Sequence, residues 1–271
     1  MIANHVKTLW SQGKPALNGW LSIANSFSAE IIAAQGYDSV CIDLQHGVID
    51  YQAAVGMLQA MRASGVVPLA RVPWLDPAAI MKVLDAGAYG VVCPMINTAA
   101  DAATLVSYVR YPPHGTRSFG PSRASLSAGD NYGAEADDNI LAFAMIETAE
   151  AFANLRDIVR TPGLDGVYIG PADLTLGLTG KAHRIGFDRE EPEMLEAIQR
   201  ILAEAKQAGI RAALHCGSPA YAARAIGWGF DLVTLPNDAR LLATAAAASV
   251  AETRAALAER ALAPLGDTRG Y

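Results

Sequence analysis

The sequence predicts a (β/α)8 barrel, or TIM barrel, built as a single domain from residues 1–271. Short β-rich segments alternate along the chain with longer helical ones. Most of the β-rich segments are nearly continuous apolar runs, which is typical of parallel strands that helices cover. Eight strand–helix units in about 270 residues match the usual size of this barrel. No low-complexity linker divides the chain.

The predicted strands follow one another at the spacing that a barrel requires. They span residues 16–23, 39–44, 67–72, 90–96, 142–147, 166–170, 211–216 and 232–235. An open doubly wound sheet is the competing fold. It would need fewer strands and usually a glycine fingerprint after the first strand, which this sequence lacks.

Capping residues mark the predicted helices. Asp76 precedes Pro77, which suits the first position of a helix. Residues 98–110 and 148–160 each begin with threonine and end with arginine, and residues 191–207 run into a glycine stop.

A final helix completes the alternation, and one other segment breaks it. Residues 237–262 are alanine-rich and strongly helical by propensity. Residues 111–139 show no clear period, and a long irregular insertion of this kind predicts a substrate loop. Arg117 and Arg123 in this insertion are candidate lining residues.

The composition limits the partners of the chain. Its 21 basic and 27 acidic residues give a net charge of −6 without a strongly basic stretch, which argues against nucleic acid. We find neither a run of about 18 apolar residues nor a signal peptide, so we expect no membrane partner. The three cysteines lie far apart in apolar runs, which suits a cytoplasmic location; they are Cys41, Cys93 and Cys216.

Polar side chains gather at the carboxyl ends of the predicted strands, where barrel enzymes place their reacting groups. They are Asp43, His46, Arg71, Glu147, Asp173 and His215. Glu147 and Asp173 follow separate strands and together suit a divalent cation such as Mg²⁺ or Mn²⁺. The alternative interpretation is that Glu147 forms a salt bridge at the rim and Asp173 caps a helix.

Asp43 and Arg71 have two interpretations each. Asp43 lies three residues before His46 and predicts a carboxylate that orients the histidine ring as a base; the alternative is a helix cap next to a histidine whose hydrogen bonds are satisfied. Arg71 suits a clamp for a carboxylate or enolate oxygen, and its alternative is a structural ion pair. No lysine lies in or directly after a predicted strand, which argues against a Schiff-base mechanism.

With these residues in place, the chain resembles the HpcH/HpaI aldolases, which are metal-dependent class II pyruvate aldolases of the 4-hydroxy-2-oxoheptanedioate aldolase type. The matching motifs occur in order over most of the chain: Asp43-Leu44-Gln45-His46-Gly47, Ala70-Arg71-Val72-Pro73, Lys82-Val83-Leu84-Asp85-Ala86-Gly87-Ala88, Val92-Cys93-Pro94-Met95, Gly115-Thr116-Arg117-Ser118, Met145-Ile146-Glu147-Thr148 and Ile169-Gly170-Pro171-Ala172-Asp173-Leu174.

The resemblance implies a role for each site residue. Glu147 and Asp173 would hold Mg²⁺, Mn²⁺ or Co²⁺, with pyruvate or its enolate completing the coordination. Arg71 would stabilise the enolate, and His46, oriented by Asp43, would handle the aldol hydroxyl proton.

The resemblance also implies contacts beyond this centre. Backbone N–H groups of Gly170 and Ala172 would hold the pyruvate carboxylate, and Asp85 would reach a neighbouring subunit's site. The final helix would swap between subunits of a homohexamer, a trimer of dimers.

Two positions depart from the family pattern, because Gln45 and Met145 stand where many members have glutamate and glutamine. Met145 and Leu214 are expected to line the substrate pocket.

The implied reaction cleaves a 4-hydroxy-2-oxoacid, in the breakdown of aromatic compounds, to pyruvate and an aldehyde. Oxaloacetate decarboxylation is the expected side activity, since it passes through the same enolate. The alternatives are a CoA-ester lyase of the malyl or citryl type and a metal-dependent hydrolase on the same barrel.

Overall fold

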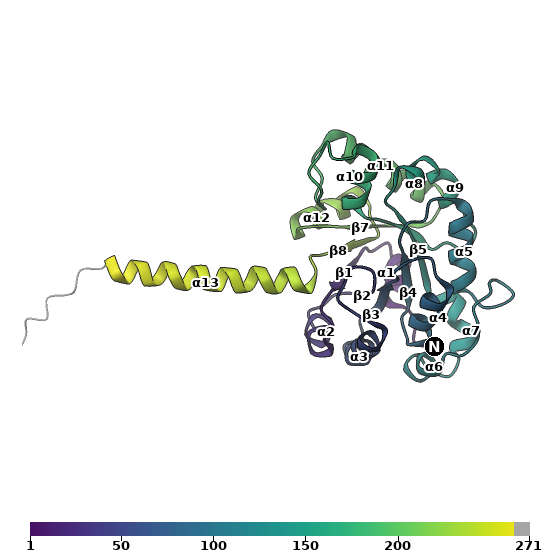
Figure 1. Cartoon of the computed structure of the whole chain (residues 1–271). Coiled ribbons are helices and arrows are strands. Elements are labelled where there is room, and N and C mark those ends of the chain that lie inside the picture. Colours follow the sequence, from purple (N-terminus) through teal and green to yellow (C-terminus); the bar gives the residue numbers. More distant parts are fainter. Residues whose placement is uncertain (263–271) are drawn as a thin grey trace, which may run out of the picture.

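The computed structural model describes residues 1–262, and the side chains of residues 1–258. Eight parallel strands close into a barrel in sequence order, which confirms the predicted fold (Figure 1). The last nine residues of the predicted domain lie outside the described residues. The strands are β1 (Ala16–Leu21), β2 (Ser39–Asp43), β3 (Val67–Arg71), β4 (Gly90–Cys93), β5 (Leu141–Ile146), β6 (Gly166–Ile169), β7 (Arg211–His215) and β8 (Leu232–Thr234).

Helices surround the barrel and cover the mainly apolar outer faces of its strands. They are α1 (His5–Ser11), α2 (Ser26–Ala33), α3 (Tyr51–Met61), the short 3₁₀ helix η1 (Arg62–Ser64), α4 (Pro77–Asp85), α5 (Ala99–Val109), α6 (Ser122–Ala128), α7 (Tyr132–Asn139), α8 (Ala149–Ala153), α9 (Leu155–Val159), α10 (Pro171–Thr179), α11 (Pro192–Gln207), α12 (Pro219–Trp228) and α13 (Asp238–Leu262).

The predicted caps form as expected. Asp76 accepts hydrogen bonds from the first turn of α4, and Thr98 forms a reciprocal capping box with Asp101 at α5. The predicted helix over residues 148–160 is instead two short helices, α8 and α9. The break falls at Asn154, whose side chain donates to the carbonyl of Asn97.

The insertion at residues 111–139 differs from its prediction in two ways. It contains the helices α6 and α7, so much of it is regular. It also joins the end of α5 to the start of β5, which places it at the amino ends of the strands and away from the carboxyl ends. Arg117 is buried there against Asp85, and Arg123 donates to the carbonyl of Ala86. It is therefore not a substrate loop of its own barrel.

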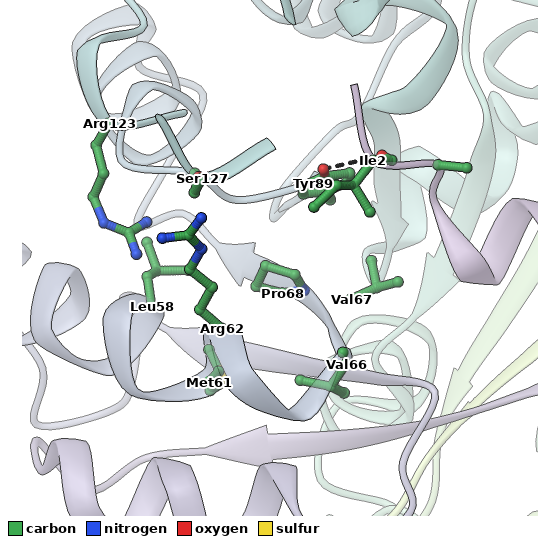
Figure 2. A pocket seen from close by; sticks show the side chains of 13 residues that line it. Ile2, Leu58, Met61, Arg62, Val66, Val67, Pro68, Tyr89, Arg123 and Ser127 are labelled. Atoms are coloured by element: carbon green, nitrogen blue, oxygen red, sulfur yellow. Dashed lines mark hydrogen bonds between the residues drawn. The ribbon is translucent and has the colours of Figure 1, made fainter. Parts of the chain in front are cut away.

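The amino end of the barrel is closed by α1. The indole nitrogen Nε1 of Trp10 donates to the carbonyl of Asp231 over 2.9 Å, and its ring meets Phe143 edge-on inside the barrel. A small pocket lies near this end, between the starts of β3 and β4 (Figure 2). Its lining is mainly apolar with Arg62 and Arg123, and it holds no carboxylate.

Helix α13 projects from the barrel after β8 (Figure 1). Its start is fixed, because the Asp238 carboxylate accepts from the backbone nitrogens of Ser22 and Ile23. By length and composition alone, residues 238–258 suffice to cross a membrane, and every residue of that segment after Asp238 is exposed. Arg240, Thr244, Ser249 and Glu252 interrupt the segment, so it passes on mean hydropathy without containing an uninterrupted run of about 18 apolar residues. Alanine supplies most of the apolar character of this segment.

Candidate active site

An ion pair between two neighbouring strand ends forms the centre of the site. Asp43 ends β2 and Arg71 ends β3, and the two are register partners. Arg71 donates from Nε to Asp43 Oδ1 over 2.9 Å and from Nη2 to Oδ2 over 2.6 Å. Burial alone would raise the pKa of Asp43, but the hydrogen bonds and charge of Arg71 outweigh it and lower this pKa.

Trp20, near the end of β1, completes this pair. Its Nε1 donates to Asp43 Oδ2 over 3.2 Å, and the Arg71 guanidinium carbon lies 4.9 Å from the Trp20 ring centroid. Trp20 is not among the predicted site residues, because an aromatic residue in an apolar strand usually belongs to the core. Its place near a strand end, in register with the strand that carries Asp43, was the available signal.

The predicted contact between Asp43 and the His46 ring is wrong. The Asp43 carboxylate accepts instead from the backbone nitrogens of Gln45 and His46, each over 3.1 Å. Among the described residues no hydrogen bond joins this carboxylate to the His46 ring, which is exposed. Asp43 therefore shapes the loop that carries His46 and holds Arg71, because those contacts and Trp20 use its acceptors.

Glu147 is a buried carboxylate directly after β5. Its Oε1 accepts from the backbone nitrogen of Met95 over 2.8 Å, which is possible because Met95 has a left-handed φ of 57°. Burial, joined by the negative charge of Asp173, raises the pKa of Glu147 to about 7 against the opposing effects of Met95 and Arg71. No sequence signal marks the role of Met95, since left-handed backbone is rare outside glycine.

Gly170 lets the end of β6 approach Glu147 closely. A Cβ atom at Gly170 would lie 2.9 Å from Glu147 Oε2 and 3.0 Å from Met145 Cε. Helix α10 begins at the next residue, so the backbone N–H of Ala172 belongs to its first turn and has no partner within the helix. Asp173 lies in the same turn with an exposed side chain. The structure thus brings five predicted residues to one rim: Met145, Glu147, Gly170, Ala172 and Asp173.

The donor set fits a hard divalent ion. Two carboxylates of like charge lie close enough for Asp173 to raise the pKa of Glu147, and a cation between them would relieve that repulsion. The side-chain oxygen of Gln45 is buried and has no hydrogen-bond partner in the described part of the chain. Within the same residues, no three His, Cys, Asp or Glu side chains cluster as a metal site. An ion here would therefore keep open positions for water or substrate.

Two predicted site residues lie elsewhere. Asp85 ends α4, which has returned to the amino end of the barrel, and it accepts from Arg117 Nη2 over 2.7 Å. Leu214 is fully buried on the face of β7 opposite His215, so it packs towards the helices. His215 is the β7 residue that points into the barrel, where its Nδ1 meets the Tyr168 hydroxyl. The expected pocket position of Leu214 is therefore wrong by one residue.

The chain has relatives in both sequence and structure. A family model described as HpcH/HpaI aldolase/citrate lyase matches residues 18–245. A hydroxypyruvate/pyruvate aldolase of Rhizorhabdus wittichii is 45% identical over 252 residues, covering 93% of this chain and 99% of the relative. A 4-hydroxy-2-oxo-heptane-1,7-dioate aldolase of Salmonella heidelberg is 35% identical over 255 residues, covering 92% and 94%.

A crystal structure of an HpcH/HpaI aldolase/citrate lyase family protein from Burkholderia cenocepacia superposes with a TM-score of 0.85. It is 31% identical and covers 93% of this chain and 100% of that structure. The family model spans most of the barrel, and the two relatives named above cover nearly the whole chain. The chain therefore belongs to the HpcH/HpaI aldolase/citrate lyase family, as its motifs indicated.

Proposed function

We propose that this protein is a class II pyruvate aldolase, a carbon–carbon lyase that reversibly cleaves 4-hydroxy-2-oxoacids to pyruvate and an aldehyde. The observation that carries this proposal is the Asp43–Arg71 pair beside the carboxylates of Glu147 and Asp173 at one barrel end. The aldolase relatives at 45% and 35% identity support it. They do not favour the alternative of a CoA-ester lyase.

Glu147 and Asp173 would hold a divalent ion, with Mg²⁺, Mn²⁺ and Co²⁺ as the candidates. When bound, the ion would supply a Lewis acid for the negative charge that develops on the keto oxygen. Arg71 adds a second positive charge next to that oxygen, and its pairing with Asp43 fixes the guanidinium plane before substrate arrives. Negative charge is thereby stabilised without a covalent bond to the protein.

The remaining residues position the substrate and move its proton. The N–H groups of Gly170, which caps α10, and of Ala172 in its first turn suit the pyruvate carboxylate, since a helix start favours an anion. The Met145 side chain packs beside Gly170 and would line the bottom of the substrate pocket. His46, exposed on the loop after β2, is free to accept the hydroxyl proton of the aldol. Oxaloacetate decarboxylation follows as a side activity, because loss of CO₂ gives the same enolate.

Metal dependence tests the proposed function. We expect exhaustive chelation to abolish pyruvate release from a panel of 4-hydroxy-2-oxoacids, and added Mg²⁺, Mn²⁺ or Co²⁺ to restore it. The control is the same protein dialysed without chelator. Full activity after chelation, or trapping of pyruvate on the protein by borohydride, would contradict the mechanism.

The exposed helix α13 supports a proposal about assembly. Leu242 and Leu257 are 64% and 59% exposed, and they project from a helix that touches the barrel only at its start. We propose that α13 packs on another copy of this chain in a cytoplasmic homohexamer, a trimer of dimers, with each barrel acting as one domain. Asp85, remote from the site of its own barrel, would then serve a neighbour's site.

A further inference from the structure

A chain of polar side chains crosses the barrel interior beneath the candidate site. The hydroxyl of Ser39 donates to Asn18 Oδ1 over 2.7 Å, and Asn18 Nδ2 donates to Thr234 Oγ1 over 2.9 Å. The hydroxyl of Tyr168 donates to the same Thr234 oxygen over 2.7 Å. All four residues are fully buried, so these hydrogen bonds are ordered parts of the core.

This chain fixes the tautomer of His215. Tyr168 has a single hydroxyl proton and gives it to Thr234, so its oxygen can only accept from the His215 Nδ1 that lies 3.0 Å away. Nδ1 therefore carries the proton. Burial and the nearby Arg71 charge lower the pKa of His215 to about 3, so the ring is neutral and Nε2 has a free lone pair.

The ring of His215 is held at the mouth of the barrel. It stacks on Phe187 at 4.5 Å between centroids and meets Trp20 at 4.9 Å. Tyr168 occupies Nδ1, so Nε2 is the ring nitrogen left for another partner, and His215 lies at the carboxyl end of β7. Among the described residues, nothing donates a hydrogen bond to Nε2. Trp20 itself binds Asp43, so this acceptor adjoins the Asp43–Arg71 pair.

The charges and lone pairs around Nε2 limit which kind of ligand group can form a hydrogen bond with it. A carboxylate offers only lone pairs and would be repelled by another acceptor, and a cationic amine would be disfavoured by Arg71. A neutral donor remains. In the chemistry of 2-oxoacids and aldehydes, that donor is a hydroxyl group.

We propose that His215 Nε2 accepts a hydrogen bond from a substrate hydroxyl next to the carbonyl group, and so makes the enzyme prefer α-hydroxylated carbonyl substrates. The inference rests on the proposed aldolase function and adds a specificity-determining residue to it. The hydroxyl can belong to the enolate-forming 2-oxoacid or to the aldehyde. Tyr168 is a positioning residue, since it acts only through the histidine tautomer.

Two pairs of nearly isosteric substrates separate these sources in aldol addition. Glycolaldehyde and propanal, each with pyruvate, differ by a hydroxyl in place of a methyl group on the aldehyde. Hydroxypyruvate and 2-oxobutanoate, each with one aldehyde, make the same exchange on the donor. We expect the ratio of kcat/KM, hydroxylated over unhydroxylated, to fall about tenfold or more in His215→Phe for the pair whose hydroxyl is bound. An unchanged ratio in both pairs, or equal losses for both members, would overturn the proposal.

Tyr168→Phe provides a second test if His215→Phe folds poorly. It leaves the imidazole in place but removes the oxygen that accepts the hydrogen bond from Nδ1. Nitrogen NMR of histidine-labelled protein should show Nδ1 protonated in the unaltered protein and a changed tautomer signal in Tyr168→Phe, together with a smaller substrate ratio. Protonation of Nε2 in the unaltered protein would refute the assignment. If no aldehyde reacts with pyruvate, the proposed function fails, and the NMR result still decides the tautomer.

Discussion

Glu147 carries a cost of burial that should be measurable in the metal-free protein. Its pKa is raised from 4.5 to about 7, so as pH rises the carboxyl group ionises at a lower pH in the unfolded chain than in the folded protein. Stability from this group is therefore full below about pH 4.5 and lost as pH rises through 7. We expect metal-free Glu147→Gln to be roughly 1–3 kcal/mol more stable than the unaltered protein near pH 8, and nearly equal to it at pH 4, by urea unfolding.

The exposed Glu150 provides the matched control, since Glu150→Gln changes the same charge outside the site. It should leave the pH profile of unfolding as it is. The same stability gain in both variants would show that net charge, and not burial of Glu147, is the cause.

His46 and Arg71 should separate proton transfer from enolate stabilisation. His46→Ala should lower retro-aldol kcat/KM by about two to four orders of magnitude and oxaloacetate decarboxylation less, since decarboxylation has no hydroxyl proton to remove. Arg71→Ala should lower both, since both pass through the enolate. Equal losses in the two reactions for His46→Ala would reassign this residue to shaping the site.

Arg71→Ala also leaves the buried Asp43 without its partner, which by itself is strongly destabilising, by about 3–5 kcal/mol. Arg71→Lys is the better-folded comparison. It keeps a positive charge but loses the two-point contact with Asp43, so we expect a partial loss of both activities.

The junction of β6 and α10 depends on the missing side chain at Gly170. Gly170→Ala would bring a methyl group to within 3.0 Å of Glu147 Oε2 and displace that carboxylate. We expect metal affinity to fall about tenfold or more, measured by calorimetry with Mn²⁺. Gly56→Ala inside α3, where a Cβ meets nothing within 4 Å, is the control and should stabilise the fold slightly.

At the level of elements, the strands were predictable because each is a separate apolar run, and all eight end within three residues of their predicted ends. Helix caps such as Asp76 could also be predicted from the sequence. The break at Asn154 was not, because its cause is a contact with Asn97, 57 residues away. The residues of the candidate site also differ in how well the sequence predicts them. Strand-end residues could be found, whereas the Asp43–Arg71 pairing and the Met95 contact depend on register and backbone geometry.

For the whole molecule, the assembly prediction concerns α13. If exposed leucines and valines bury against another copy, charges placed there should dissociate the assembly. We expect Leu242→Glu with Val250→Glu to give monomers by size-exclusion chromatography with light scattering. Thr253→Glu, an exposed polar position on the same helix, is the control. A monomeric unaltered protein, or an unchanged mass in the double variant, would contradict the proposal.

The seam between β1 and β8 has a consequence for how the chain matures. It pairs Asn18 with Thr234, and the Asn18 amide reaches the Thr234 hydroxyl across it. These residues lie 216 positions apart, so a chain emerging from the ribosome cannot complete the barrel until its final strand has been synthesised. Edge strands stay open to wrong partners throughout that interval. The hydrogen bond between Asn18 and Thr234 then stabilises the correctly closed barrel. The tautomer of His215 becomes fixed only when the last strand docks, because Tyr168 needs Thr234 as its acceptor.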